Sequence, residues 1–282
     1  MEEGRGGLQR LVVRAQQADA EIYLHGAHVT HFQPRGQKPV LFLSGKSWFD
    51  TGKPIRGGVP ICFPWFTTGP DGKQTPSHGF ARLQDWELVS AAESGDGAVE
   101  IALRFASNEV TRRLWDENFG AEFRVRIGAA LGMELRVHNT SPGPIRIEEA
   151  LHTYLAVSDV RQVGIEGLAG ATYLDTVGTP ARKTEGDAPI CILGETDRVY
   201  LATRSTCVVH DPGWQRRLVV EKTGSDSTVL WNPWIAKAQR MPDFGDDEWP
   251  TMLCIETCNV REHAVTIPPG KTHAMTAQVR VE

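Results

Sequence analysis

Three segments near the middle of the chain alternate apolar and polar side chains with a period of two residues. They are AVEIALRF (98–105), EFRVRI (122–127) and MELRVHN (133–139). Successive side chains of a strand point to opposite faces of a sheet, so each segment packs one face on a core and leaves the other face in water. A sheet with one wet face is typically antiparallel. The pattern therefore predicts antiparallel strands.

Short strand-like segments separated by turn residues occupy much of the remaining chain. They are expected at 8–14, 20–26, 28–33, 39–43, 206–211, 216–222, 227–232, 251–258, 263–267 and 273–281. Many short strands, with 28 glycines and 17 prolines available for turns, favour an all-β fold, a large β-sandwich of two twisted sheets. Because no repeat or linker divides the chain, residues 1–282 are predicted to form one domain.

Helix is expected to be a minor ingredient. A helical turn is predicted within 113–119, and a helix over 232–241. In the second segment Asn232 is a possible N-cap and Pro233 would occupy the first helical position, where its missing N–H costs nothing.

Charge and hydropathy exclude several classes of partner. The chain has 30 Lys and Arg against 35 Asp and Glu, a net charge of −5, so it offers no basic field for nucleic acid. The first residues lack the apolar core of a secretory signal, and no apolar run is long enough to span a bilayer. Five cysteines at scattered positions are typical of reduced thiols in the cytosol. A cytoplasmic protein without nucleic-acid or membrane partners is therefore expected.

The stretch RGGVPICFPWFTTGPDGKQTPSHGFAR (56–82) is unlike ordinary scaffold sequence. Arg56 and Arg82 enclose paired glycines, two prolines, three aromatic residues and a polar loop that ends at His78. Glycine permits close approach of the backbone to a ligand, the aromatic residues can form an apolar platform, and guanidinium groups bind anions in bidentate fashion. The stretch is therefore interpreted as a small-molecule pocket. A well-ordered loop packed on a sheet is the alternative.

Two titratable residues lie in strand-like segments that are apolar on both faces. His152 in IRIEEALHTYLAV shares a strand face with Tyr154, and Glu256 in MLCIETC shares one with Cys254 and Cys258. Burial raises the pKa of a carboxyl group toward neutrality, which suits a general base, and histidine is suited to act as its partner. The alternatives are that Glu256 pairs with an arginine and that His152 is a hydrogen-bonded core residue.

No metal site is predicted. His25, His28 and His31 are spaced by three residues, which places alternate members on opposite faces of a strand. Cys254 and Cys258 share a face, but no second Cys/His pair stands near them in sequence, so both are interpreted as core thiols. The chain has no phosphate loop, dinucleotide fingerprint or serine elbow, so no cofactor is expected.

Six blocks of the sequence, in order, resemble one family. IRGGVPICFPWF, HGFAR, ALHTYLAVSD, ETDRVY, WNPWIAKAQRMPDFGDDEW and CIETCNV are similar to the glucose-6-phosphate 1-epimerases, or hexose-6-phosphate mutarotases, among the aldose-1-epimerase-like proteins. The resemblance covers the chain from about residue 20 to its end. It implies a galactose-mutarotase-like β-sandwich and an isomerase that interconverts the α and β anomers of a hexose 6-phosphate without a cofactor.

The resemblance also implies roles for particular residues. His152 matches the family's catalytic histidine and Glu256 its catalytic glutamate. In the family's mechanism the glutamate removes the proton of the C1 hydroxyl while the histidine protonates the ring oxygen. The ring opens, the aldehyde rotates, and closure on its other face inverts C1.

The resemblance implies substrate contacts as well. Arg56 and Arg82 match phosphate and sugar contacts, His78 matches a second pocket histidine, and Asp197 in ETDRVY matches a residue that accepts hydrogen bonds from sugar hydroxyls. Relatives often have a glutamine before the pocket histidine, where this chain has Ser77, whose hydroxyl reaches less far. Many relatives also have a glycine where the loop TTGPDGKQTPS begins, so the preference among sugars stays open.

Two further functions remain open. A carbohydrate-binding module would need the aromatic platform but no acid–base pair, whereas an aldose 1-epimerase for free sugars would have no use for two arginines. The presence of both His152 and Glu256 argues against the module, and Arg56 with Arg82 argues against the free-sugar enzyme. The expected partner is a small-molecule hexose 6-phosphate, and the chain is expected to be a monomer.

Overall fold

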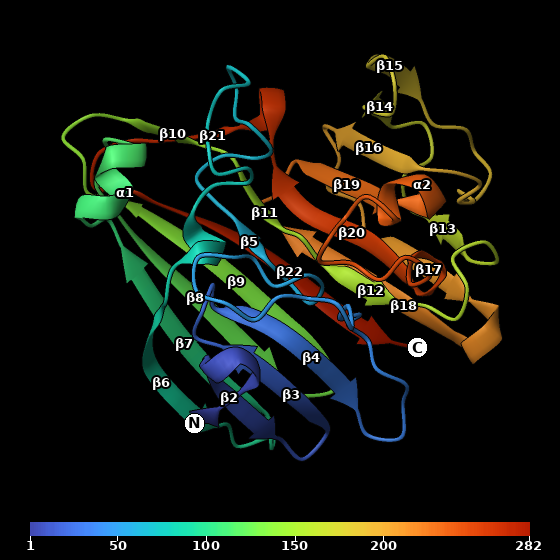
Figure 1. Cartoon of the computed structure of the whole chain (residues 1–282), viewed down its shortest axis with the longest axis horizontal. Coiled ribbons are helices and arrows are strands. Elements are labelled where there is room, and N and C mark those ends of the chain that lie inside the picture. Colours follow the sequence, from blue (N-terminus) through green and yellow to red (C-terminus); the bar gives the residue numbers. More distant parts are fainter.

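The computed structural model describes residues 1–282, and antiparallel strands dominate it (Figure 1). The strands are β1 (Glu2–Glu3), β2 (Gln9–Arg14), β3 (Ala18–Tyr23), β4 (His28–Pro34), β5 (Ile61–Cys62), β6 (Glu87–Glu93), β7 (Val99–Ala106), β8 (Phe119–Ile127), β9 (Ala130–Asn139), β10 (Ile145–Ile147), β11 (Glu149–Leu151), β12 (Tyr154–Ala156), β13 (Gly164–Glu166), β14 (Thr172–Asp175), β15 (Ala181–Thr184), β16 (Thr196–Leu201), β17 (Cys207–Asp211), β18 (Arg216–Thr223), β19 (Ser227–Asn232), β20 (Met252–Asn259), β21 (Val265–Ile267) and β22 (Thr272–Val281). The α-helices are α1 (Glu109–Leu114) and α2 (Trp234–Ala238). No helix has the length and apolar character that a membrane span requires.

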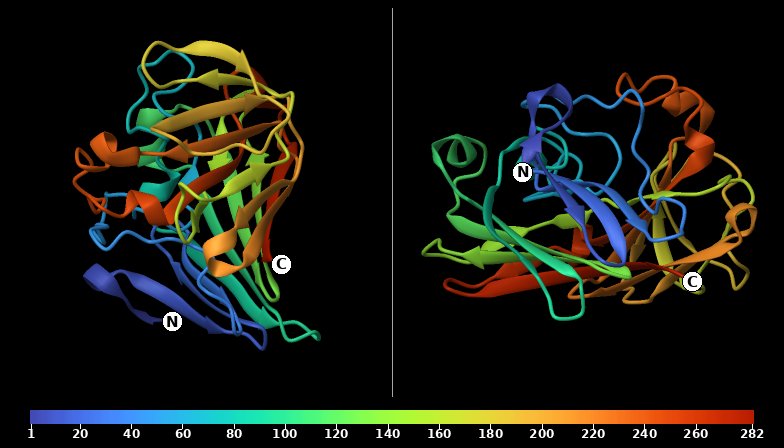
Figure 2. Two further views of the ribbon diagram at one scale, coloured as in Figure 1. Left: turned by 90° about the vertical axis from the view of Figure 1, so that its right-hand side faces the viewer. Right: turned by 90° about the horizontal axis from the view of Figure 1, so that it is seen from below.

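Two eight-stranded sheets form the body of the molecule. The first, called the β9 sheet, has the order β13-β17-β18-β22-β9-β8-β7-β6. The second, called the β20 sheet, has the order β15-β14-β16-β19-β20-β11-β5, with β12 also paired to β20. A four-stranded sheet of β1 to β4 lies over part of the β9 sheet, and β10 pairs with β21 (Figures 1 and 2). The predicted all-β sandwich of antiparallel strands is confirmed, and the N-terminal strands add a sheet to the two expected.

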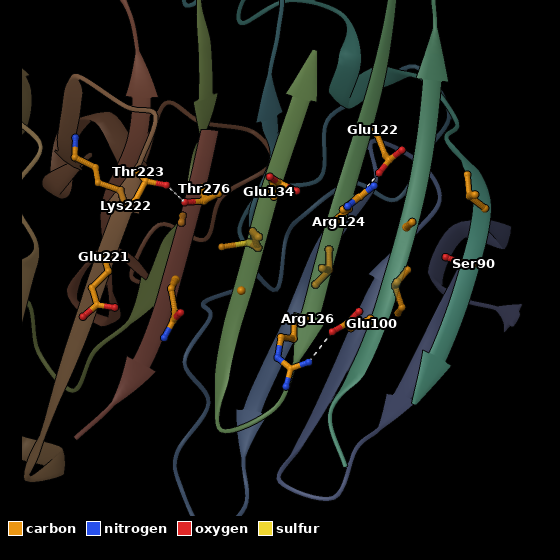
Figure 3. Close-up of a pocket in the computed structure, with 18 residues that line it drawn as sticks. Ser90, Glu100, Glu122, Arg124, Arg126, Glu134, Glu221, Lys222, Thr223 and Thr276 are labelled. Atoms are coloured by element: carbon orange, nitrogen blue, oxygen red, sulfur yellow. Dashed lines mark hydrogen bonds and ion pairs between the residues drawn. The ribbon is translucent and has the colours of Figure 1, made fainter. Parts of the chain in front are cut away.

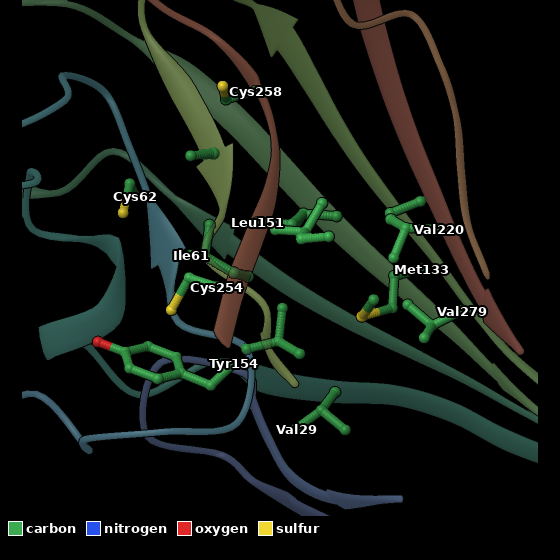
Figure 4. Packing of buried hydrophobic residues seen from close by; sticks show 14 of the residues in the cluster. Val29, Ile61, Cys62, Met133, Leu151, Tyr154, Val220, Cys254, Cys258 and Val279 are labelled. Atoms are coloured by element: carbon green, nitrogen blue, oxygen red, sulfur yellow. The ribbon is translucent and has the colours of Figure 1, made fainter. Parts of the chain in front are cut away.

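The alternating segments occupy the β9 sheet as their pattern requires. In β7, Ile101, Leu103 and Phe105 are buried, whereas Arg104 between them is exposed. The buried face packs into a core of 71 residues that includes parts of both large sheets. Figure 4 shows Leu151 of the β20 sheet on the side of Met133, Val220 and Val279. Burial of this apolar surface is the main stabilising contribution to such a sandwich.

In the middle of the β20 sheet, at β19 and β20, the side chains on the other face are buried as well. Figure 4 shows Cys62, Cys254 and Tyr154 on the side away from the β9 sheet. All three are buried because the segment that includes residues 44–82 and the segment after α2 cover this face. The face therefore lies in a low-dielectric environment built by loops.

Three local predictions were wrong or only partly right. Residues 39–43 form no strand: only isolated bridges join Leu41 to Leu155 and Leu43 to Gly57. The helix predicted within 113–119 lies earlier, because Asn108 caps its N-terminus by accepting the N–H groups of Val110 and Thr111.

The second helix is shorter than predicted and begins at Trp234. The Asn232 side-chain oxygen accepts the Trp234 N–H at 2.9 Å, as an N-cap would, but the Asn232 amide nitrogen donates to the carbonyl oxygens of Trp249 and Met252. Asn232 is also the last residue of β19. The residue therefore joins a strand end, a short helix and the start of β20 instead of beginning a long helix.

A buried ion pair joins the two large sheets and predicts a pH-dependent stability. His273 Nε2 of β22 lies 2.7 Å from the Glu149 Oε1 of β11, whose side chain is fully buried. Burial lowers the pKa of His273, but the hydrogen bond and charge of Glu149 outweigh it, so the pKa lies above its ordinary value. A raised pKa stabilises the fold fully below the pKa of the unfolded histidine, and this contribution is lost as the pH rises through the folded pKa.

We expect His273→Gln to lower the free energy of unfolding by about 1.5–3 kcal/mol at about pH 5.5, where the wild-type histidine is charged. At about pH 9 the same replacement should cost much less, because the wild-type pair has already lost its proton. Denaturant unfolding at both pH values measures the difference. His138→Gln, at an exposed position of neighbouring β9, is the matched control. An equal loss at both pH values would contradict the prediction.

Candidate active site

The pairing of strands in the β20 sheet places a row of functional side chains on its covered face. Asp197 pairs with Trp231, Trp231 with Cys254, and Cys254 with Tyr154. Residues directly opposite each other share a face, so all four point to the same side. Glu256 is two residues beyond Cys254 on β20 and therefore points to this side too.

His152 lies in the break between β11 and β12, directly beside Glu256. Its backbone N–H donates to the Pro60 carbonyl at 3.0 Å. Its ring stacks on the Tyr154 ring with centroids 4.7 Å apart and an angle of 8° between the planes. This places His152 Nε2 at 3.3 Å from Glu256 Oε1. The structure thus brings together the histidine and the glutamate that were each predicted from the sequence as titratable site residues.

Burial gives this pair unusual protonation. The pKa of Glu256 is raised well above its ordinary value by burial and by the charge of Asp197, against the opposing effect of Arg82. The pKa of His152 is lowered well below its ordinary value by burial and then by the charges of Arg56 and Arg82. Both shifts favour the neutral form of each side chain. Glu256 Oε2 and His152 Nδ1 are buried without a hydrogen-bond partner.

The stretch from Arg56 to Arg82 runs alongside the histidine segment. Cys62 pairs with Ala150, and the Gly58 carbonyl accepts the Tyr154 N–H at 2.9 Å. Gly57 and Gly58 have φ values of 115° and 60°, and a Cβ atom at either position would lie 2.5 or 2.2 Å from a carbonyl oxygen of a neighbouring segment. These glycines therefore permit close packing of backbone on backbone.

The predicted aromatic platform is wrong in part. Phe63, Trp65 and Phe66 are at most 4% exposed and belong to the core, although the edge of the Phe66 ring touches His78 with centroids 4.8 Å apart. The rings beside His152 belong to Tyr154 and Trp231. Sequence reasoning did not select these two, although Tyr154 lies two residues after the histidine on its strand face and Trp231 lies in the WNPW block.

Arg56 is balanced by an acidic partner that the sequence did not reveal. Its Nε and Nη2 donate to Asp243 Oδ2 at 3.2 and 3.0 Å, and its Nη1 donates to the Tyr154 hydroxyl at 3.0 Å. Asp243 lies in the segment after α2 and is buried. Through Tyr154 the Arg56–Asp243 pair supports the ring on which His152 stacks.

Arg82 has no such balance. Its side chain makes one hydrogen bond, from Nη2 to the Ser77 carbonyl at 2.8 Å, and its Nε is buried without a partner. Burial lowers its pKa, as expected for a cation removed from water without a carboxylate partner. Ser77 is exposed, and its contribution to this contact is its backbone carbonyl. Arg82 is therefore a buried positive charge without a carboxylate partner.

His78 and Asp197 act on different members of the His152–Glu256 pair. The His78 ring centroid is 5.9 Å from that of His152, its Nδ1 is 3.4 Å from the Cys62 sulfur, and its pKa is lowered by burial and by Arg82. Burial raises the pKa of Asp197, although Lys237, 3.8 Å away, opposes the shift. His78 therefore lies beside the histidine of the pair, and the charge of Asp197 acts on the glutamate.

The three histidines at 25–31 do not converge. His25 Nε2 bonds with the Lys53 carbonyl oxygen and His28 Nε2 with the Gly57 carbonyl oxygen, while His31 is only half-buried. All five cysteines are free, and Cys254 and Cys258 are buried as expected of core thiols.

A hollow on the surface of the molecule lies away from these residues. It has a volume of ≈ 680 Å³ on the outer face of the β9 sheet, where Arg126 pairs with Glu100 and Arg124 with Glu122 (Figure 3). None of the residues selected from the sequence lines it. Its paired charges balance one another, so the chemistry of this chain is expected on the β20 sheet.

Comparison with known proteins shows which family the chain resembles. Residues 9–280 match the family described as aldose 1-epimerase. A relative from Cenchrus ciliaris, named "putative glucose-6-phosphate 1-epimerase", is 37% identical over 276 residues, which are 94% of this chain and 82% of that protein. A relative of the same name from Escherichia coli (strain K12) is 35% identical, with 90% of this chain and 84% of that protein covered.

Solved structures agree as well. The crystal structure of "a putative mutarotase" from Salmonella typhimurium superposes with a TM-score of 0.91 at 32% identity, covering 97% of this chain and 90% of that chain. A galactose mutarotase related enzyme from Lactobacillus acidophilus shares the fold, with a TM-score of 0.77 at 13% identity and 97% of each chain covered. The expected mutarotase-like fold is thereby confirmed.

Proposed function

The chain belongs to the aldose 1-epimerase family and is an isomerase that interconverts sugar anomers; we propose that its substrate is glucose 6-phosphate. The observation that carries the proposal is the distance of 3.3 Å between His152 Nε2 and Glu256 Oε1. Opening the ring removes a proton from O1 and adds one to the ring oxygen O5, and both oxygens are bonded to C1. An acid and a base that act on two such oxygens must lie near each other, as these two groups do.

The proposed steps balance within the pair. Glu256 takes the O1 proton as the C1–O1 double bond forms, the C1–O5 bond breaks, and O5 receives a proton from His152. After rotation about C1–C2, neutral His152 takes the O5 proton back and Glu256 returns a proton to O1 as the ring closes on the other face. The pair therefore alternates between an ionised and a neutral form with one shared proton, and the site ends as it began.

The shifted pKa values of His152 and Glu256 suggest how the substrate phosphate assists proton transfer. The free site favours neutral His152 and Glu256, whereas ring opening starts from the ionised pair. Arg82 lowers the pKa of His152. A phosphate dianion bound to Arg82 offsets that effect and raises the pKa of His152, which favours the imidazolium required to protonate O5.

The remaining substrate contacts are proposed from the same geometry. Asp197, whose charge acts on Glu256, accepts hydrogen bonds from sugar hydroxyls, while Arg56, His78 and Ser77 contact the sugar or its phosphate. A carbohydrate-binding module would gain nothing from a buried acid–base pair. An enzyme for free sugars would gain nothing from Arg82, whose unbalanced charge is costly to bury.

Exchange NMR on the anomeric protons tests the proposal. With catalytic amounts of protein, the exchange between α- and β-glucose 6-phosphate should exceed the rate in buffer, and glucose should be accelerated far less. Equal acceleration of both sugars would indicate a free-sugar epimerase. No acceleration of either sugar would overturn the proposed catalysis and favour the binding module.

We expect activity to survive removal of metal ions, because ring opening needs two proton transfers and no change of oxidation state. Exchange NMR before and after dialysis against a chelator measures this, with dialysis against plain buffer as the control. Activity that was lost with the chelator and restored by zinc or manganese would contradict the cofactor-free proposal. The histidines at 25–31 would then be tested first.

We also propose that residues 1–282 act as one domain and as a monomer in the cytoplasm, with a small-molecule substrate and no nucleic-acid or membrane partner. The net charge of −5 and the free cysteines support this assignment. Sedimentation at several protein concentrations tests the oligomeric state.

A further inference from the structure

Three residues with left-handed backbone conformation meet beside the His152–Glu256 pair. Thr67, His78 and Arg261 have φ values of 50°, 63° and 61°. The His78 N–H donates to the Thr67 carbonyl at 2.7 Å, and Arg261 Nη2 donates to the Thr67 hydroxyl at 3.4 Å. Such conformations are costly for residues other than glycine, most of all for a β-branched one, and they gather at functional sites. Arg261, which sequence analysis did not select, therefore belongs to a constrained cluster.

A buried carboxylate holds this cluster together. Glu148 Oε1 accepts the Arg261 N–H at 2.6 Å, and Oε2 accepts the Phe66 N–H at 3.0 Å. The Glu148 N–H donates to the Pro64 carbonyl at 2.9 Å. The side chain is 3% exposed, so these charge-assisted bonds form in a dry environment and fix the turn after β20 against the 64–67 loop.

The Arg261 guanidinium forms no salt bridge with a carboxylate, although its charge partly offsets the rise that burial causes in the pKa of Asp197. Its one hydrogen bond is the contact with Thr67, and its Nε is buried without a partner. Arg82 is in the same state, whereas Arg56 is paired with Asp243. The pKa of His78 is lowered by burial, by Arg82 and, to a smaller degree, by Arg261, so both charges act at the same side chain.

The chemistry of the substrate says where its phosphate must lie. In a hexose 6-phosphate the phosphate is joined to the ring oxygen through C5, C6 and O6. A sugar with O5 at His152 therefore carries its phosphate on the histidine side of the pair. His78 lies beside His152 on that side. The His78 backbone N–H donates to the carbonyl of Thr67, and the hydroxyl of Thr67 accepts a hydrogen bond from Arg261.

We propose that Arg261 is a further specificity-determining residue, which binds the substrate phosphate together with Arg82. The inference rests on the proposed function and deepens it. Two guanidinium groups without carboxylate partners supply the charge that a dianion requires, and the Glu148 clamp fixes one of them in advance.

Arg261→Met, with Arg14→Met as control, tests the inference. Arg14 is an exposed arginine of β2. Arg261→Met should lower kcat/KM for glucose 6-phosphate by about tenfold, mostly through KM, because the phosphate changes little during ring opening. With glucose as substrate the rate should be unchanged, and Arg261→Lys should retain part of the preference for the phosphorylated sugar.

Calorimetric titration with glucose 6-phosphate separates this inference from the proposed function. If wild-type protein binds the phosphosugar without accelerating its anomerisation, the proposed function fails. Weaker binding of the phosphosugar by Arg261→Met, with unchanged binding by Arg14→Met, would still support the phosphate contact. Unchanged Kd and KM in a folded Arg261→Met variant would overturn the inference. So would equal losses on glucose and glucose 6-phosphate, because the arginine would then only hold the loop.

Discussion

Replacing His152 by Ala or Glu256 by Gln should slow anomer exchange of glucose 6-phosphate by about 10²–10⁴-fold, the usual contribution of general acid–base catalysis. Both side chains are buried within one pair, and each transfers a proton in the same event. Glu256→Gln keeps the size of the side chain but removes the carboxylate that accepts and returns the proton. Because burial already favours the neutral form of Glu256, a neutral amide should be tolerated by the fold.

Exchange NMR gives the rates, and circular dichroism with thermal unfolding checks the fold. The double variant should be little slower than the slower of the two single variants, because the acid and the base act in one ring-opening event. His138→Ala, at an exposed position, is the matched control for His152→Ala. A folded variant with a near-normal rate would show that the replaced residue has no catalytic role.

The sequence predicted the strands best where one face is wet. In β7, β8 and β9 the period of two is imposed by water on one side and core on the other, so it can be read locally. In β19 and β20 both faces are buried, and the pattern disappears. The strand over 39–43 was predicted because Val40, Leu41 and Phe42 are apolar, yet this segment makes only single bridges.

The candidate site could be predicted only in part, because its contacts join residues far apart in the chain. His152 and Glu256 are unusual within apolar segments, and the resemblance marked Arg56 and Arg82. Nothing local marks Asp243 or Glu148, whose importance depends on the distant groups they bind: Arg56 for the first, and the Phe66 and Arg261 backbone for the second. Arg261 follows β20 in an ordinary polar segment, and only the fold brings it to Thr67.

Replacing Arg82 by Met should lower kcat/KM for glucose 6-phosphate by about 100-fold, toward the upper end expected for charge-assisted hydrogen bonds to a dianion. Arg82 is more deeply buried than Arg56 and has no carboxylate partner, so its charge is less screened by water and by protein. The chain's net charge of −5 gives a dianion no general attraction, and discrimination must come from such local groups. Much of the loss should appear in KM, with a smaller fall in kcat if the phosphate also orients the ring.

Glucose lacks the phosphate, and its slow exchange in the presence of Arg82→Met protein should change little at a fixed pH near the optimum. The optimum itself should move to higher pH, because the Arg82 charge lowers the pKa of both His152 and Glu256. Arg56→Met provides the comparison: its charge is already balanced by Asp243, so its loss should be smaller and should affect both sugars through the Tyr154 ring that supports His152. Equal losses of kcat/KM on the two sugars for Arg82→Met, without a shift of the pH optimum, would contradict this prediction. Arg82 would then only stabilise the loop through its hydrogen bond to the Ser77 carbonyl.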